Sequence, residues 1–174
     1  HDLREAGLVD VTSTYGHAFG GDLETVNVFS ARVATRLAGR ADVLVVAMGP
    51  GGVGTHTKLG FTGIEQGQVL DAAGALGGRP IACVRVSFDD ARERHRGISH
   101  HGMTTLTLVT ARRATVVLPA LPGVPGEVMR EQCERGGIEE LHEVVEADGS
   151  EAAAAREPHE WRFEQRKQAR AVDL

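Results

Sequence analysis

The chain lacks any long apolar run: no stretch of its 174 residues reaches the roughly 20 apolar residues that a helix needs to cross a bilayer. A signal-peptide pattern is also missing. Positive charge is in deficit, because the formal net charge is −5 at pH 7, whereas general nucleic-acid-binding proteins are usually basic. We therefore expect neither a membrane nor a nucleic acid among the partners of the chain, and we expect a cytoplasmic location.

Cysteine is scarce, with only Cys83 and Cys133. They fall in segments predicted to be a buried strand and a helix, so we expect free thiols rather than a disulfide. Neither is placed for covalent catalysis, and the chain has no nucleophile elbow and no Walker A motif. His142 and His159 stand alone, and we assign them no chemistry. The first residue is His1 rather than Met, which indicates a fragment or a processed product.

Glycine, by contrast, is abundant: 22 residues, nearly double the usual share of about 7%. Many of these glycines separate apolar runs and mark turns. Strand-like runs alternate with helical patterns, which predicts parallel strands joined by right-handed crossovers. The expected strands are Val9–Tyr15, Asp42–Met48, Ile81–Phe88, Thr115–Leu118 and Glu143–Ala147. The strand near Val144 is the best candidate for an antiparallel edge.

Four helices are expected between these strands. An apolar face with spacings of three and four predicts the first, over Val26–Leu37. Thr62 and Glu65 fit a capping box that would start the second. The third begins at Ser99, and the fourth covers about Pro125–Arg135, with proline at its start.

These elements predict an α/β domain over residues 1–148. Its expected architecture is a three-layer sandwich around a mostly parallel sheet of about five strands, Rossmann-like in arrangement. Residues 149–174 differ in composition, with Trp161 and Phe163 as their only aromatic residues. We expect them to form a peripheral helical tail.

A glycine-rich loop, Gly49–Lys58, directly follows the apolar run Asp42–Met48. Its glycines let the backbone turn sharply and approach a ligand, since glycine has no Cβ. Its hydroxyl groups and one lysine add donors that suit a phosphate or a carboxylate. The alternative is a turn that only packs a strand against a helix. The ligand-binding residues predicted in this loop are Gly51, Gly52, Gly54, Thr55, Thr57 and Lys58.

A second loop, Asp89–His101, follows the expected strand Ile81–Phe88 and is rich in arginine and histidine. Its guanidinium groups lie beside a predicted helix start, where unpaired N–H groups favour an anion. Histidines in such a pocket can act as general acid or base near neutral pH. The alternative is a solvated basic loop in which the serine only caps a helix. The predicted ligand-binding residues are Arg94, Arg96 and Ser99, and the candidate catalytic residues are His95, His100 and His101.

Asp22, in the loop after the first expected strand, is a further candidate catalytic residue, as a carboxylate partner for an arginine or a metal. It is equally well explained as the N-cap of the following helix. A metal site formed by the three histidines with Asp89 or Asp90 is also conceivable. However, His-x4-His-His is no established ligand spacing, and adjacent histidines on a helix point in different directions. We therefore predict no metal.

Loops at the carboxyl ends of parallel strands open on the same edge of a sheet, where ligands bind. We therefore expect Gly52, Lys58, Arg94, Arg96 and His100 to line one pocket. The predicted function is an enzyme, a transferase or a hydrolase, that acts on a small anionic or phosphorylated molecule. A non-catalytic metabolite-binding or regulatory domain is the alternative that uses the same edge. The sequence identifies no cofactor.

Several segments occur in the order and spacing of a known family: Gly20–Asn27, Met48–Gly67, Leu76–Pro80 and Arg94–His101. Through them the chain, from about Leu3 to Asp148, resembles bacterial domain-of-unknown-function family 3866. The resemblance implies that a further N-terminal region precedes this chain in the full-length protein, and it implies no activity. A sheet without its N-terminal strands would expose an edge or an apolar face, so we expect a homo-oligomer.

Overall fold

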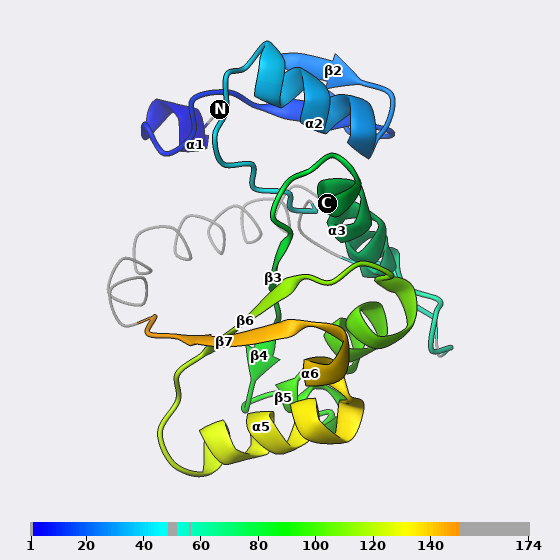
Figure 1. The fold of residues 1–174 in the computed structure, drawn as a ribbon, viewed down its shortest axis with the longest axis vertical. Coiled ribbons are helices and arrows are strands. Elements are labelled where there is room, and N and C mark those ends of the chain that lie inside the picture. Colours follow the sequence, from blue (N-terminus) through cyan, green and yellow to red (C-terminus); the bar gives the residue numbers. More distant parts are fainter. Residues whose placement is uncertain (1, 49–51, 56, 150–174) are drawn as a thin grey trace, which may run out of the picture.

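The computed structural model describes residues 2–48, 52–55 and 57–149 (Figure 1). Within them, no helix is long and apolar enough to cross a membrane. The predicted helical tail, 149–174, lies outside the described residues except for Gly149, and the predicted ligand-binding residue Gly51 also lies outside them.

The first four elements form a small unit at the top of Figure 1. They are α1 (Asp2–Glu5), β1 (Ser13–Tyr15), β2 (Leu23–Thr25) and α2 (Val28–Leu37). The two strands pair with each other in parallel and with no other strand of the described chain. The first expected strand therefore exists, but it belongs to a separate two-stranded sheet.

The N-cap of α2 is Asn27, not Asp22. The side chain of Asn27 accepts a hydrogen bond from Ser30 N at 3.0 Å, and Ser30 Oγ accepts one from Asn27 N at 3.1 Å. This reciprocal pair is a capping box. Asp22 instead accepts hydrogen bonds from the backbone N and the hydroxyl of Thr12, at 2.9 and 2.8 Å, and pairs with Arg4. The N-cap alternative for Asp22 is therefore wrong, because its carboxylate holds the segment before β1.

The expected strand Asp42–Met48 is wrong. Its residues pair with no strand of the described chain, and the side chains of Val43 and Val45 are 81% and 85% exposed. An apolar run favours burial, but a strand also needs a neighbour with free backbone N–H and C=O groups. The run makes no such pairing within the described chain.

The main sheet has three strands, β3 (Ile81–Cys83), β6 (Thr115–Pro119) and β7 (Glu143–Ala147), in the order β3-β6-β7. All pairings are parallel, and the register places Ala82 beside Val116, which in turn lies beside a valine of β7. The α/β class and the mostly parallel pairing are confirmed. The expectation of an antiparallel edge at β7 is wrong, because α6 returns the chain to the same end of the sheet. One sheet of about five strands and a Rossmann-like arrangement are not confirmed.

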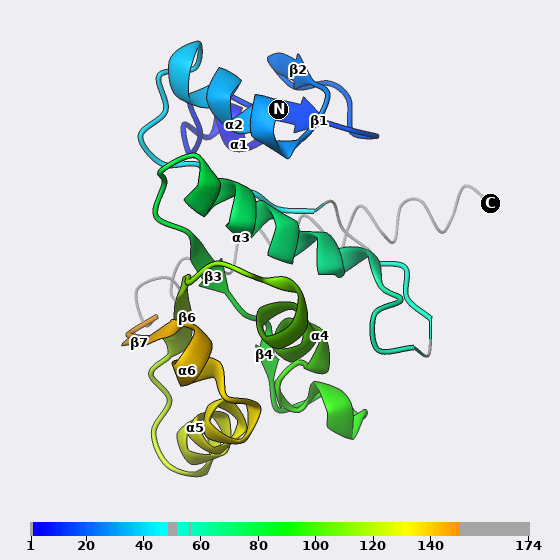
Figure 2. The same ribbon diagram turned by 45° about the vertical axis from the view of Figure 1, so that its right-hand side comes forward.

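The remaining helices are α3 (Glu65–Ala75), α4 (His100–Thr104), α5 (Val124–Gly136) and α6 (Ile138–Leu141). A π-helical turn, η3 (Thr105–Val109), continues α4. Figure 2 shows α4, α5 and α6 together on one side of the main sheet.

The core lies between the main sheet and these helices. Alternate residues of the strands point into it, as expected for a sheet with one covered face. The opposite face is partly open within the described chain: Ile81 is 54% exposed and Val145 is 38% exposed. The described residues thus form two layers rather than the expected three. The buried core comprises Leu70, Ala82, Ile98, Leu106, Ala114, Val116, Leu118, Met129, Cys133 and Ile138.

The expected strand Ile81–Phe88 breaks after Cys83. The chain leaves the main sheet and forms β4 (Val86–Ser87), which pairs antiparallel with β5 (Gly97–Ile98). Between β4 and β5 lies a single 3-10 turn, η2 (Glu93–His95). This hairpin at the carboxyl end of β3 carries the arginine- and histidine-rich loop.

A second 3-10 turn, η1 (Thr62–Ile64), precedes α3. Thr62 does not cap α3 as predicted, because its hydroxyl accepts a hydrogen bond from the backbone N of Val53 at 3.2 Å. The same residue donates its backbone N–H to the Val53 carbonyl at 2.8 Å. Thr62 therefore fastens the end of the glycine-rich loop instead of starting a helix.

Candidate functional site

A cavity of about 340 Å³ lies where the glycine-rich loop, η1 and the start of α4 meet the chain that leaves β3. Its walls are largely apolar, with a small number of polar groups, which is typical of a site for a small molecule. The lining residues are Met48, Gly52, Val53, Gly54, Phe61, Thr62, Gly63, Gln66, Val84, Arg85, Ser99, His101, Gly102 and Thr105.

The glycine-rich loop reaches the cavity through its middle and not through its hydroxyl-bearing end. Gly54 pairs with Phe61 in an isolated antiparallel bridge, which holds this part of the loop beside η1. The hydroxyls of Thr55 and Thr57 lie 2.8 Å apart, and Thr55 also donates to the carbonyl of Gly60. Both hydroxyls are thus engaged within the loop. Their local hydrogen bonds explain why neither residue lines the cavity.

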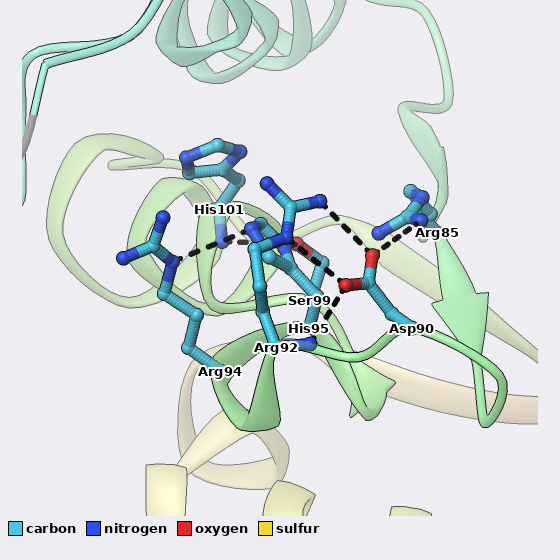
Figure 3. A network of polar contacts seen from close by, with 7 residues as sticks. All are labelled: Arg85, Asp90, Arg92, Arg94, His95, Ser99 and His101. Atoms are coloured by element: carbon cyan, nitrogen blue, oxygen red, sulfur yellow. Dashed lines mark hydrogen bonds and ion pairs between the residues drawn. The ribbon is translucent and has the colours of Figure 1, made fainter.

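The histidine-bearing loop reaches the cavity through the start of α4 (Figure 3). Ser99 is the N-cap of this helix, as predicted, and its hydroxyl accepts a hydrogen bond from the backbone N of His101 at 3.4 Å. The same hydroxyl lies 2.9 Å from Nδ1 of His95, which is only 4% exposed. One serine therefore connects the buried histidine of η2 to the helix that carries the other two.

The three histidine rings gather in one cluster. The ring centroids of His100 and His101 lie 4.1 Å apart, and those of His95 lie 4.7 Å from His100 and 5.2 Å from His101. Phe61 stacks on the cavity side of the cluster, with its centroid 4.1 Å from that of His101. The argument that adjacent histidines point in different directions does not hold here, because the rings of His100 and His101, in the first turn of α4, contact each other.

Beside this cluster, one carboxylate is shared by two arginines. Asp90 accepts hydrogen bonds from the side chains of Arg85 and Arg92, at distances of 3.0 to 3.1 Å (Figure 3). The hydrogen bonds from Arg92 hold the pKa of Asp90 well below its ordinary value. Two guanidinium groups on one carboxylate leave one positive charge in excess, and Arg94 adds another. The Nε of Arg94 lies 3.5 Å from Nε2 of His95.

Burial and this positive charge act together on the imidazoles. Burial, followed by the charge of Arg92, lowers the pKa of His95. Burial is also the largest cause for His100 and for His101, with neighbouring His101 and Arg94, respectively, next in size. Burial and the nearby positive charges thus favour the neutral form of all three rings. A neutral imidazole can accept a proton or bind a metal ion.

Only some of the predicted site residues line the cavity. Gly52, Gly54, Ser99 and His101 line the cavity, while His95 and His100 contact His101 from behind. The rest of the predicted set lies outside the lining. Asp22 contacts Arg4 and Thr12 in the N-terminal unit. The other predicted residues outside the lining are Thr55, Thr57, Lys58, Arg94 and Arg96.

Among the residues of the cavity wall that sequence reasoning did not assign to the site are Phe61, Gln66 and Arg85. Arg85 had an available signal, because it follows the end of β3 by two residues, where loops at the carboxyl edge begin. Phe61 had none, since only the three-dimensional bridge to Gly54 brings it to the cavity.

Comparison with known proteins places the chain in a family without assigning it an activity. The searches of curated proteins and of solved structures found no match. One family model, described as a protein of unknown function (DUF3866), matches residues 1–172. This match covers the segments that carry the resemblance and extends past Asp148. It confirms the resemblance, and the chain belongs to this family of proteins of unknown function, DUF3866.

Proposed function

We propose that the chain binds a small anionic molecule in the 340 Å³ cavity. The observation that carries this proposal is the meeting of two loops there: Gly52 and Gly54 from one, Arg85, Ser99 and His101 from the region after β3. A volume of this size suits a small metabolite.

The charge balance supports an anion. Asp90 pairs with both Arg85 and Arg92, so the pair of arginines is only half neutralised. Arg94 has no carboxylate partner in the described part of the chain. Excess positive charge at the rim of a cleft raises the local concentration of anions and strengthens their binding. The carboxylate of Asp90 also orients the two guanidinium groups, so less rotamer entropy is lost on binding.

The apolar walls narrow the class of ligand. Met48, Val53, Phe61 and Val84 contribute apolar surface to the lining, to which Arg85, Ser99 and His101 add polar groups. A free inorganic anion would leave this apolar surface without contacts. The arrangement suits a molecule with an anionic group, such as a phosphate or a carboxylate, and a compact apolar or planar body.

A second candidate function, hydrolysis of the anion or group transfer to or from it, is favoured by the imidazole of His101 in the cavity wall, whose pKa is lowered by burial and by Arg94. A lower pKa favours the unprotonated ring, which can accept a proton near neutral pH. This function requires the first, because the substrate must bind beside His101. Release of inorganic phosphate from a nucleoside monophosphate, compared between the wild type and His101→Gln, tests it.

The binding proposal is tested by isothermal titration of the chain with a nucleoside monophosphate and with inorganic phosphate. We expect the nucleotide to bind more tightly, because only it can cover the apolar walls. Arg85→Gln should weaken nucleotide binding about tenfold, since the guanidinium is 55% exposed and its contact is partly screened.

Arg130→Gln is the matched control. Arg130 is 62% exposed and also pairs with one acidic residue, Glu146, but it lies on α5 away from the cavity lining. Equal weakening by the two substitutions would mean that only net charge matters, and the cavity would then not be the site. Absence of binding for both probes would contradict the proposal outright.

A further inference from the structure

The histidine cluster contains a set of potential metal ligands that the anion site does not use. One ring nitrogen from each of His95, His100 and His101 lies within 4.8 Å of those from the other two. Three ligands on a tetrahedral ion with bonds of 2.0–2.1 Å are about 3.3 Å apart. Small side-chain rotations would therefore bring these nitrogens to one ion, with no change in the backbone.

The ring of His95 is oriented as a metal-binding imidazole should be. Nε2 of His95 faces the Nε–H of Arg94 at 3.5 Å, which makes it the unprotonated nitrogen. Nδ1 then carries the hydrogen and donates it to Ser99 Oγ at 2.9 Å. A hydrogen bond from the second ring nitrogen fixes the tautomer and raises the basicity of the first, as in protein metal sites.

The other two rings are also held in place. The ring of His101 stacks on Phe61 with an interplanar angle of 13°. Nε2 of His100 is buried and has no hydrogen-bond partner in the described chain. A buried polar atom without a partner is costly unless something binds it. A metal ion at the centre of the cluster would satisfy this nitrogen.

The charges around the histidine cluster would allow a metal cation there to lie next to an anionic ligand in the cavity. Asp90 neutralises only one of the charges of Arg85 and Arg92, so the repulsion that an ion would meet comes from the remaining charge of this pair and from Arg94. Arg94 is exposed on the loop surface and can swing away. An anionic ligand in the cavity would offset the remaining positive charge.

We propose that His95, His100 and His101 together bind one divalent transition-metal ion of the Zn²⁺ type, with its open coordination position toward the cavity. Three imidazole nitrogens exclude Mg²⁺ and Ca²⁺, which require oxygen ligands. They suit Zn²⁺ and its neighbours, and three protein ligands with one open position are the arrangement of catalytic zinc sites.

Metal binding goes beyond the proposed function and does not depend on it. A bound ion occupies a ring nitrogen of His101, so this ring could not then also act as the proton acceptor. Water on the ion would take over that part, because coordination to Zn²⁺ lowers the pKa of water. The metal experiment therefore also decides between the two roles of His101.

The test is titration of the tag-free chain, first treated with a chelator, with Zn²⁺ and separately with Co²⁺, in the absence of any phosphate. We expect one ion per chain and, with Co²⁺, the intense visible absorption of a four-coordinate ion. His100→Ala and His101→Ala should each abolish stoichiometric binding. Ser99→Ala keeps all three ligands and should weaken binding 10- to 100-fold through loss of orientation of His95.

His17→Ala is the control, because His17 is exposed and lies outside the cluster. If it reduces binding as much as His101→Ala does, the metal is adventitious and the proposal is wrong. Wild-type chain that gives no four-coordinate Co²⁺ spectrum also overturns it, whether or not the variants fold. Binding of the nucleoside monophosphate to the chelator-treated chain is measured in a separate titration. Failure of the metal proposal can therefore be distinguished from failure of the anion-binding proposal.

Discussion

The imidazole of His101 lies flat on the ring of Phe61, with centroids 4.1 Å apart and planes 13° apart. Phe61 lies three residues after the glycine-rich loop, at the start of η1, and His101 is in the first turn of α4, 40 residues further along the chain. This stacked pair joins the two segments that sequence analysis singled out. It also forms the wall between the cavity and the histidine cluster.

The first prediction concerns this stack. Phe61 is 7% exposed, and Phe61→Leu retains most of its apolar volume while removing the aromatic contact. We expect a loss of about 1 kcal/mol in the free energy of unfolding, the usual additional contribution of an aromatic pair beyond its buried area. Urea denaturation measures it. Phe29→Leu, at a residue that is 47% exposed, should change stability by less than about 0.5 kcal/mol.

The second prediction concerns the hairpin that supports the histidines. Gly97 has φ +70°, and a Cβ there would collide with the side-chain amide of Gln132. This amide accepts a hydrogen bond from Ile98 N at 2.8 Å and donates one to the Arg96 carbonyl at 3.0 Å, so it cannot move without losing both. Gly97→Ala should therefore destabilise the fold by about 2–4 kcal/mol, from backbone strain plus lost hydrogen bonds.

Gly77→Ala separates the two causes. Gly77 has φ +74° but nothing within 4 Å of its added Cβ, so only the backbone cost of about 1 kcal/mol applies. Both variants are compared by thermal and chemical unfolding. If Gly97→Ala proved no more harmful than Gly77→Ala, the contact with Gln132 would not hold β5 in place.

Local patterns predicted several elements of the fold well. β6 and β7 were expected from short apolar runs, and β7 covers the predicted range Glu143–Ala147. α5 starts at Val124, with Pro125 in its first turn, and ends at Gly137 in the left-handed region. The N-cap at Ser99 was also predicted. These features depend on side chains within one or two turns of each other, and such information is present in the local sequence.

The predictions that failed concern features that depend on residues far apart in the sequence. The run Asp42–Met48 has the composition of a strand, but it pairs with no strand of the described chain. β3 ends where it does because the residues that follow it form β4, which pairs antiparallel with β5. The contact between His95 and His101 depends on both η2 and the N-cap of α4. Spacing along a helix cannot reveal a cluster whose first member lies outside the helix.

The third prediction concerns acid sensitivity of the N-terminal unit. The backbone hydrogen bond from Thr12 is the largest cause that lowers the pKa of Asp22, followed by the Thr12 hydroxyl and by Arg4. The carboxylate form is therefore favoured by folding. Its stabilising contribution is fully present above the ordinary pKa of 3.8 and is lost as pH falls from there through the lower folded-state pKa.

We expect the thermal midpoint of the wild type to fall as pH is lowered below about 4. Asp22→Asn cannot titrate and should show a weaker dependence over that range, from a lower starting stability. Circular dichroism melts at closely spaced pH values measure both. Asp10→Asn is a suitable control, because Asp10 is an exposed aspartate in the same N-terminal part of the chain. Parallel curves for the wild type and Asp22→Asn would rule out this account.

The last prediction concerns His142, which is 1% exposed and lies far from the histidine cluster in sequence. Its Nδ1 accepts a hydrogen bond from Ala114 N at 3.3 Å, so its Nε2 carries the hydrogen and donates it to the Leu106 carbonyl at 2.8 Å. The ring thereby connects η3 to the start of β6. His142→Leu would leave both backbone groups buried without partners, each at about 1–3 kcal/mol. We expect a loss of roughly 3 kcal/mol in the free energy of unfolding, measured by urea denaturation with an unchanged dependence of this free energy on urea concentration. His17→Leu, at an exposed position, should stay within about 0.5 kcal/mol of the wild type. A His142→Leu chain as stable as the wild type would show that these two hydrogen bonds do not stabilise the fold, and it would leave burial of a histidine at this position without a structural reason.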